Sequence, residues 1–133
     1  MAHTAKLSLQ KEEFNLFELD YEFTQQMNEN GQPAGNTRRG NITMVMPSPD
    51  DNTLLFHEWM TAPNEHKDGT CTFSVMETGK TSTKTMKFYH AYCIRLREYI
   101  KEKNDQMLTE ITLSAKVITF GEEDDVVFGD VTS

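Results

Sequence analysis

Apolar and polar residues alternate through most of this chain, most regularly in residues 15–24. The apolar members of that stretch share one parity and are Phe17, Leu19, Tyr21 and Phe23. The other parity is acidic or polar, with Glu18, Asp20, Glu22 and Thr24. Because successive side chains of a strand point to opposite faces, this period of two predicts a strand with one apolar and one acidic face. A helix would scatter the same aromatic rings around its circumference.

The same alternation predicts further strands along the chain, at residues 5–9, 41–46, 71–75, 84–100 and 107–117. The longest of these is expected to be one bent strand, or two strands joined by a kink. Its apolar parity includes Met86, Phe88, His90, Tyr92, Ile94, Leu96 and Ile100. Residues 77–80, with Gly79 and Lys80, favour a hairpin turn.

One segment changes to a helical period. Ser48 is a candidate N-cap, Pro49 suits the first helical position, and Asp50 and Asp51 complement the positive end of the helix dipole. Apolar residues then recur at spacings of three and four as far as Ala62. We therefore predict one amphipathic helix over about Pro49–Ala62 that covers the sheet, with Trp59 as its buried anchor. The fold class is mainly β, a sandwich or barrel with one flanking helix.

Residues 28–40 lack apolar periodicity. Asn30 with Gly31 favours a turn, and Pro33 removes a donor from any strand ladder. The segment is longer than a hairpin connection of about two to five residues. We predict a protruding loop with Arg38 and Arg39 as a basic spot; a functional loop and a plain surface excursion both remain open.

The length and the charge of the chain exclude several classes of function. The 133 residues fit one domain spanning 1–133, in which the acidic tail 121–133 is expected to be loosely ordered. A net charge of -8 argues against binding to nucleic acid or to anionic membranes. No apolar run reaches the ~20 residues of a membrane helix, and the N-terminus has no apolar core of a signal peptide. We expect no membrane insertion and a cytoplasmic protein.

The two cysteines, Cys71 and Cys93, are too few for a disulfide framework and are expected to be reduced. We predict that they are unpaired, because Cys71 lies on the apolar parity of its strand and Cys93 lies on the polar parity of its own strand. Burial of Cys71 follows from the same pattern.

Candidate catalytic and metal-binding motifs are weak. Gly79-Lys80 lacks the preceding glycine of a phosphate loop, since position 74 is Ser. The four histidines show no metal-ligand spacing, and His90 is expected to be a packed core histidine. The acidic row of residues 18–22 is more typical of a solvated strand face than of a catalytic pair. We predict no enzyme activity, no metal and no cofactor.

Several stretches occur in a recognisable order between residues 5 and 120. They are an N-terminal hairpin with Tyr21 and Phe23, a turn at residues 30–33, Gly40 and Ile42, residues 49–60, residues 86–93 and residues 107–115. In this order they resemble the Hcp-type tube protein of bacterial type VI secretion systems, specifically the TssD branch of Bacteroidetes-like systems. Gln32 stands where that family has Arg, and the tail after Gly121 has no counterpart in the family pattern.

The resemblance implies a small antiparallel β-barrel of two sheets with one helix. It implies hexameric rings that stack into a hollow tube, which a sheath drives out behind a spike. Expected partners are other copies of the chain, the sheath, spike and baseplate proteins, and effectors carried in the lumen. The protein would be cytoplasmic and then secreted through the type VI machine. Strand faces with Thr109, Thr112 and Ser114 would line the lumen or meet a neighbour.

The resemblance also assigns roles to individual residues. Ring stacking falls to the loop residues Asn28, Asn30, Gly31, Gln32, Pro33, Arg38 and Arg39. The expected core anchors follow instead from the apolar parities and the helical spacing, and they are Tyr21, Phe23, Trp59, Phe88 and Tyr92. Two alternatives remain. One is a monomeric β-barrel that binds a small apolar ligand in its interior, and the other is a tube subunit of another contractile injection or phage-tail-like particle.

Overall fold

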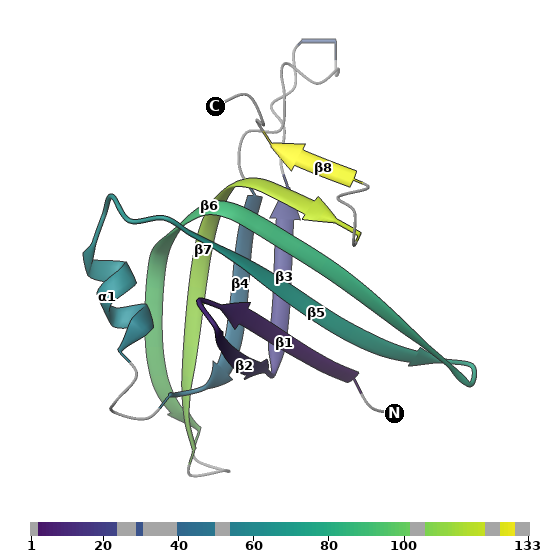
Figure 1. The fold of residues 1–133 in the computed structure, drawn as a ribbon. Coiled ribbons are helices and arrows are strands. Elements are labelled where there is room, and N and C mark those ends of the chain that lie inside the picture. The colour runs from purple at the N-terminus through teal and green to yellow at the C-terminus, as the bar shows by residue number, and fades with distance from the viewer. Residues whose placement is uncertain are drawn as a thin grey trace.

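A computed structural model describes residues 3–23, 29–30, 40–49, 54–101, 106–121 and 126–129. These residues form eight strands and one short helix (Figure 1). The strands are β1 (His3–Leu9), β2 (Glu12–Leu16), β3 (Glu18–Phe23), β4 (Gly40–Pro47), β5 (Lys67–Glu77), β6 (Lys80–Lys101), β7 (Gln106–Phe120) and β8 (Val126–Gly129). The helix is α1 (Leu55–Thr61).

All described strands belong to one antiparallel sheet in the order β2-β1-β5-β6-β7-β4-β3, with β8 paired to β7. The sheet curls into a half-barrel, and α1 packs beside β6 (Figure 1). The predicted β-rich fold with one helix is confirmed. The two expected sheets are the two walls of one continuous sheet, because β6 belongs to both: its residues 80–91 pair with β5, and its residues 86–101 pair with β7.

The two ends of the strand order, β2 and β3, are joined by Phe17 alone. The Phe17 N–H donates to the Val45 carbonyl at 2.7 Å, while the Phe17 ring is 55% exposed. The single strand predicted over residues 15–24 is therefore wrong, because the chain turns at Phe17 to pass from one end of the sheet to the other. In β3 the predicted alternation holds, with its acidic side chains exposed.

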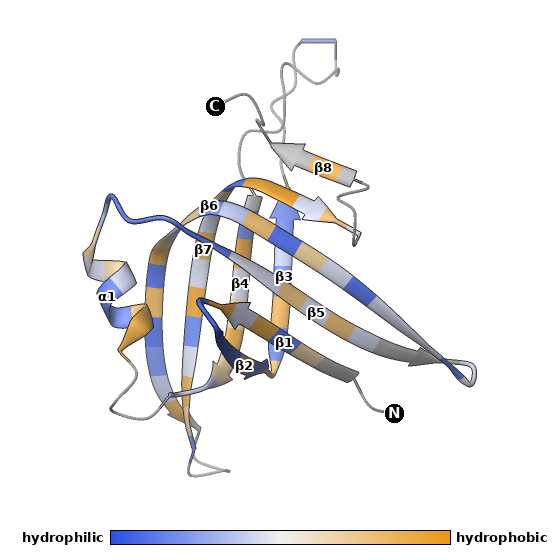
Figure 2. Ribbon diagram, in the orientation of Figure 1, coloured by the Kyte–Doolittle hydropathy of each residue, from blue (hydrophilic) through white to orange (hydrophobic). Residues whose placement is uncertain are grey.

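The core lies between the inner face of the sheet and α1. Figure 2 shows apolar and polar positions alternating along β6 and β7, as two-faced strands require. Trp59 and Phe56 are each 1% exposed, and the Phe56 ring lies 5.1 Å from Phe14 of β2. Phe88 is fully buried, whereas Tyr21 and Phe23 pack partly buried against the core.

The helix is shorter than predicted at its start. Ser48 and Pro49 are not helical. The Ser48 N–H donates to the Met107 carbonyl at 3.0 Å, and Ser48 Oγ lies 2.7 Å from Thr109 Oγ1. Ser48 therefore continues the contact of β4 with β7 and does not cap the helix. The acidic residues Asp50 and Asp51 lie outside the described residues.

Strand β6 changes the parity of its buried residues at His90. This residue has φ 54°, and β6 is bulged there relative to β5, because Lys67 pairs with Ala91 and Gly69 with Phe88. After His90 the buried residues are Ala91 and Cys93. The prediction of a core His90 is therefore wrong, since its side chain is exposed.

Tyr92 is also displaced from the core by this change of parity. It is half-buried and lies 5.9 Å, centroid to centroid, from the His66 ring. A second irregularity, between Cys93 and Arg95, shifts the parity back. Beyond it Leu96 packs against the core, while Ile94 and Ile100 are 50% and 68% exposed.

The cysteines are unpaired, as predicted, but both lie in the core. The expectation of opposite faces is wrong, because it ignored the parity change in β6. The Cys71 thiol lies 3.9 Å from the Met44 sulfur, and the Cys93 thiol donates to the Arg95 carbonyl at 3.7 Å. Burial raises the pKa of Cys71 to about 12, so this thiol stays protonated at neutral pH.

Part of the acidic tail is a strand. Residues 126–129 form β8 and pair with residues 117–120 of β7. Residues 122–125 and 130–133 lie outside the described part of the chain. None of the helical residues described by the structure forms a segment long and apolar enough to span a bilayer.

Candidate assembly surfaces

One wall of the half-barrel carries polar side chains on the side that points away from the core. We call this side of the wall the polar face. It is formed by β3, β4, β7 and the second half of β6. Its members alternate with buried residues such as Ile42 and Ile111. The residues of the polar face are Glu18, Asp20, Glu22, Asn41, Thr43, Arg95, Arg97, Glu110, Thr112 and Ser114.

Strand register arranges these side chains in rows across the wall. One row runs Asp20, Thr43, Thr112, Arg95, and the next runs Glu18, Val45, Glu110, Arg97. Both of these rows begin with an acid on β3 and end with an arginine on β6, whereas the row of Glu22, Asn41 and Ser114 ends at Tyr92. The polar face is therefore negative along one side and positive along the other.

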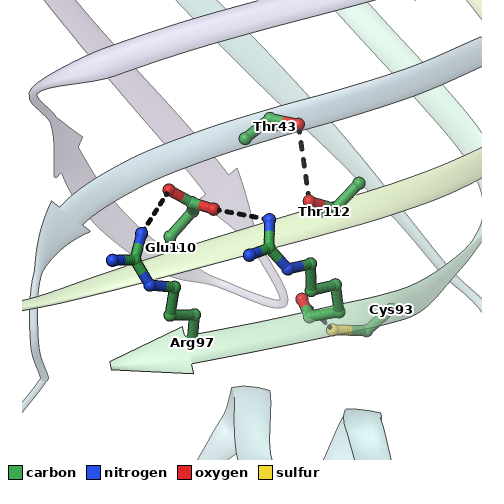
Figure 3. Close-up of polar contacts among 6 residues, drawn as sticks. Thr43, Cys93, Arg97, Glu110 and Thr112 are labelled. Carbon is green, nitrogen blue, oxygen red and sulfur yellow. Dashed lines mark hydrogen bonds and ion pairs between the residues drawn. The ribbon is translucent and has the colours of Figure 1, made fainter. Parts of the chain in front are cut away.

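Glu110 lies between the two arginines (Figure 3). Its carboxylate is 3.0 Å from Arg95 and 3.6 Å from Arg97, and its side chain is 15% exposed. The guanidinium of Arg97 also lies 4.4 Å from the centroid of the Tyr99 ring. Two guanidiniums share one carboxylate, so this group keeps a net positive charge. Both arginines are more than half exposed and can meet another acidic surface.

Small hydroxyl side chains occupy the middle of the wall. Thr43 Oγ1 lies 3.4 Å from Thr112 Oγ1, and Ser114 lies two residues further along β7 on the same face, opposite Asn41. Thr109 does not belong to this face. It is 1% exposed on the opposite parity, where its hydroxyl lies 3.4 Å from Glu98 Oε2.

The wall has two open edges among the described strands. Strand β3 ends the strand order, and β6 beyond Ala91 pairs with β7 alone because its pairing with β5 stops there. Open edges present backbone N–H and C=O groups to a further strand. The acidic side of the polar face borders one open edge, and the arginine side borders the other.

Apolar side chains are exposed around α1 and where the end of β6 pairs with the start of β7. Ile100 and Met107, which face each other in register, are 68% and 44% exposed. Leu54, just before α1, is 50% exposed, and Met60 is 38% exposed. These side chains are candidate contacts for a neighbouring chain.

Of the loop residues predicted to stack rings, only Asn30 is described, and it is exposed. The others lie outside the described residues: Asn28, Gly31, Gln32, Pro33, Arg38 and Arg39. The stacking loop therefore stays a prediction. Sequence reasoning missed Arg95, Arg97 and Glu110, although two arginines separated by Leu96 on the polar parity of a predicted strand were a visible signal.

The interior is filled by side chains. Leu7, Ile42, Met44 and Phe88 are all fully buried in one cluster. A hollow of about 470 Å³ lies elsewhere, open to solvent and lined by Tyr21, Thr83, Lys84, Thr85, Phe120 and Gly121. This arrangement does not favour an apolar ligand held inside a monomeric barrel.

Comparison with known proteins supports the family resemblance. Residues 1–125 match the family model described as hemolysin coregulated protein Hcp (TssD). A search of curated proteins gives no match. Hcp1 from Flavobacterium johnsoniae has a similar structure, with a TM-score of 0.69 at 21% identity, covering 96% of this chain and 99% of that chain.

Two further solved structures extend the comparison. Hcp1 from E. coli EAEC 042 gives a TM-score of 0.68 at 9% identity, covering 98% of this chain and 97% of that chain. The tube-terminating cap of the anti-feeding prophage gives a TM-score of 0.59 at 17% identity, covering 88% of this chain and 87% of that chain. At these identities the likeness establishes the fold alone.

Proposed function

Because this chain belongs to the Hcp (TssD) family, we propose that it assembles into hexameric rings that stack as the inner tube of a type VI secretion system. The observation that carries this proposal is the family match over residues 1–125. Members of this family are structural tube proteins that form hexameric rings. The curled sheet with one short helix fits the same role.

The two open edges of the wall support a specific ring contact. In a head-to-tail contact each subunit presents one surface to the next and a different surface to the previous one, and a fixed rotation closes the ring. We place the β3 edge of one subunit against the β6 edge of its neighbour. The acids of β3 then approach Arg95 and Arg97 of the next chain, and the walls join into one continuous sheet around the lumen.

In this arrangement the polar face lines the lumen. Threonine, serine and charged side chains keep such a surface wetted, which suits passage of folded cargo without adhesion. We propose that effectors occupy this lumen, and that sheath, spike and baseplate proteins contact the outer surface and ends of the tube. The protein would reside in the cytoplasm until contraction carries it out of the cell.

The head-to-tail contact can be tested with two complementary variants. The first makes β3 basic by the changes Glu18→Lys, Asp20→Lys and Glu22→Lys. The second makes the β6 side acidic, and preserves its internal pairing, by the changes Arg95→Glu, Arg97→Glu and Glu110→Lys. Each variant alone sets like charges against each other at every contact, so we expect neither to form rings.

A mixture of the two variants should form rings, because alternation restores opposite charges at every contact of a ring with an even number of subunits. Light scattering should give the mass of six 15.3 kDa chains for the original protein and for the mixture, and a smaller mass for each variant alone. Added salt should weaken assembly of the mixture. Rings from either variant alone, with unchanged melting temperatures, would contradict this contact, while an original protein that stays monomeric would contradict ring assembly itself.

A further inference from the structure

Two imidazole rings meet on the outer surface where the connection from α1 reaches the bulge of β6. His66 precedes β5, and His90 is the residue of β6 with positive φ. Their Nδ1 atoms are 3.3 Å apart, and the ring centroids are 4.6 Å apart at an interplanar angle of 71°. We propose that His66 and His90 together bind a late first-row divalent transition cation, with Zn²⁺ as the representative ion.

The separation of the two nitrogens fits two bonds to one metal ion. Zn–N bonds are about 2.0–2.1 Å long, and tetrahedral coordination then separates two ligand nitrogens by about 3.3–3.4 Å. A hydrogen bond from an N–H group to an oxygen acceptor is shorter, most often about 2.9–3.0 Å long. The observed 3.3 Å therefore matches the span of a chelate better than that of a strong hydrogen bond.

The backbone holds His90 in place for this contact. A non-glycine residue with positive φ is uncommon, and such strained residues cluster at functional sites. The conformation is secured by Asp68, whose carboxylate accepts a hydrogen bond from the His90 N–H at 2.8 Å. Asp68 lies opposite the bulge, so it acts as a positioning residue and also adds negative charge near the cation.

Imidazole binds a metal in its neutral form through a nitrogen lone pair. When the two neutral rings share a hydrogen bond, one Nδ1 carries a proton. Binding requires that this proton move to Nε2 of the same ring, and no proton is released overall. Among the described residues no group of three metal-binding side chains occurs, so water would complete the coordination. The bound ion should therefore exchange readily.

Calorimetric titration of the full-length protein with ZnCl₂ tests the proposal. The variants are His66→Gln and His90→Asn, since asparagine tolerates the left-handed backbone that His90 adopts. Loss of a second-shell partner alone weakens metal binding about 10–100-fold, so loss of either ligand should weaken zinc binding by at least about tenfold. The matched control is His57→Gln on α1, which removes a histidine bound to Glu98 and should leave zinc affinity unchanged.

Long-range ¹⁵N spectra of the imidazole rings give a second readout. Zinc should shift the Nδ1 resonances of His66 and His90 and leave those of His57 in place, and Mg²⁺ should shift none of them. If both site variants keep the original affinity, or if His57→Gln weakens binding as much as they do, zinc binding is adventitious and the proposal is wrong. Neither readout depends on ring assembly, so the result is separate from that of the tube proposal.

Discussion

Trp59 fixes α1 to the start of β5 through three kinds of contact. Its ring is buried, and its Nε1–H donates to the Glu65 carbonyl at 3.1 Å. The Lys67 ammonium lies 5.8 Å from the Trp59 ring centroid and 3.0 Å from the Glu65 carboxylate. Lys67 is only 8% exposed, so the indole and the carboxylate together compensate a nearly buried charge.

We predict that Trp59→Ala destabilises the protein by about 3–5 kcal/mol, because it leaves a large cavity in the core. It also removes the ring beside Lys67. Urea unfolding followed by circular dichroism measures the loss, with Trp59→Phe as a control that keeps much of the buried area. An unchanged unfolding midpoint for Trp59→Ala would show that α1 does not pack through this residue.

At the scale of elements, β6 carries the main departure from a regular strand. It is shared by both walls, and its buried parity shifts at His90 and again after Cys93. The first shift is made by one residue in the left-handed region, with φ 54°. A side chain in that region costs about 1–2 kcal/mol relative to glycine.

We therefore predict that His90→Gly is more stable than His90→Ala by about 1–2 kcal/mol, since both lose the imidazole and only glycine is unstrained. Thermal unfolding of the two variants without added metal measures the difference. The same pair of changes at Tyr92, which has no positive φ, should favour alanine. Equal stability of the two His90 variants would mean that β6 relaxes without strain.

The alternation in the sequence predicts most of the strands, but it misses irregular backbone conformations such as the positive φ of His90 within β6. Strands β4, β5 and β7 follow the alternation closely, because each has one face on the core. The shift at His90 could not be predicted, since no glycine or asparagine marks it. The arginines of the polar face were missed for another reason, since the irregularity between Cys93 and Arg95 restores the predicted parity and only register places Arg95 and Arg97 beside Glu110. The helix start was wrong because Ser48 has a competing partner in β7, distant in sequence.

At the scale of the whole molecule, stacking of acidic subunits is opposed by the electrostatic repulsion between their net negative charges. Each chain has a net charge of -8, and Arg38 and Arg39 form a basic spot in the predicted loop. These residues lie outside the described residues, so their role rests on the sequence and the family resemblance. We propose that they favour contact between rings more than they favour the fold. Each exposed charge contact contributes only about 0.2–1 kcal/mol, but a ring repeats it around its circumference.

The double change Arg38→Glu, Arg39→Glu should leave the melting temperature and the ring mass nearly unchanged and should reduce tube formation. Electron microscopy of equal protein concentrations measures tube length, and added salt should shorten tubes of the original protein. Arg38→Lys, Arg39→Lys keeps the charge and serves as the control. Tubes of normal length from the glutamate variant, or loss of its rings, would contradict the stacking role.

Several paired strands are far apart in the sequence, and this separation affects folding while the chain is being synthesised. The β1–β2 hairpin is synthesised well before β5, with which β1 completes its ladder, and β4 gains its second neighbour only when β7 has been synthesised. Such non-local pairing slows folding, and a strand edge that waits for its partner can recruit a strand from another chain. A chain that later associates with copies of itself thus passes through a stage in which mispairing competes with folding. Rapid translation through β5 and β7, or a chaperone that shields the first hairpin, would increase the yield of assembly-competent subunits.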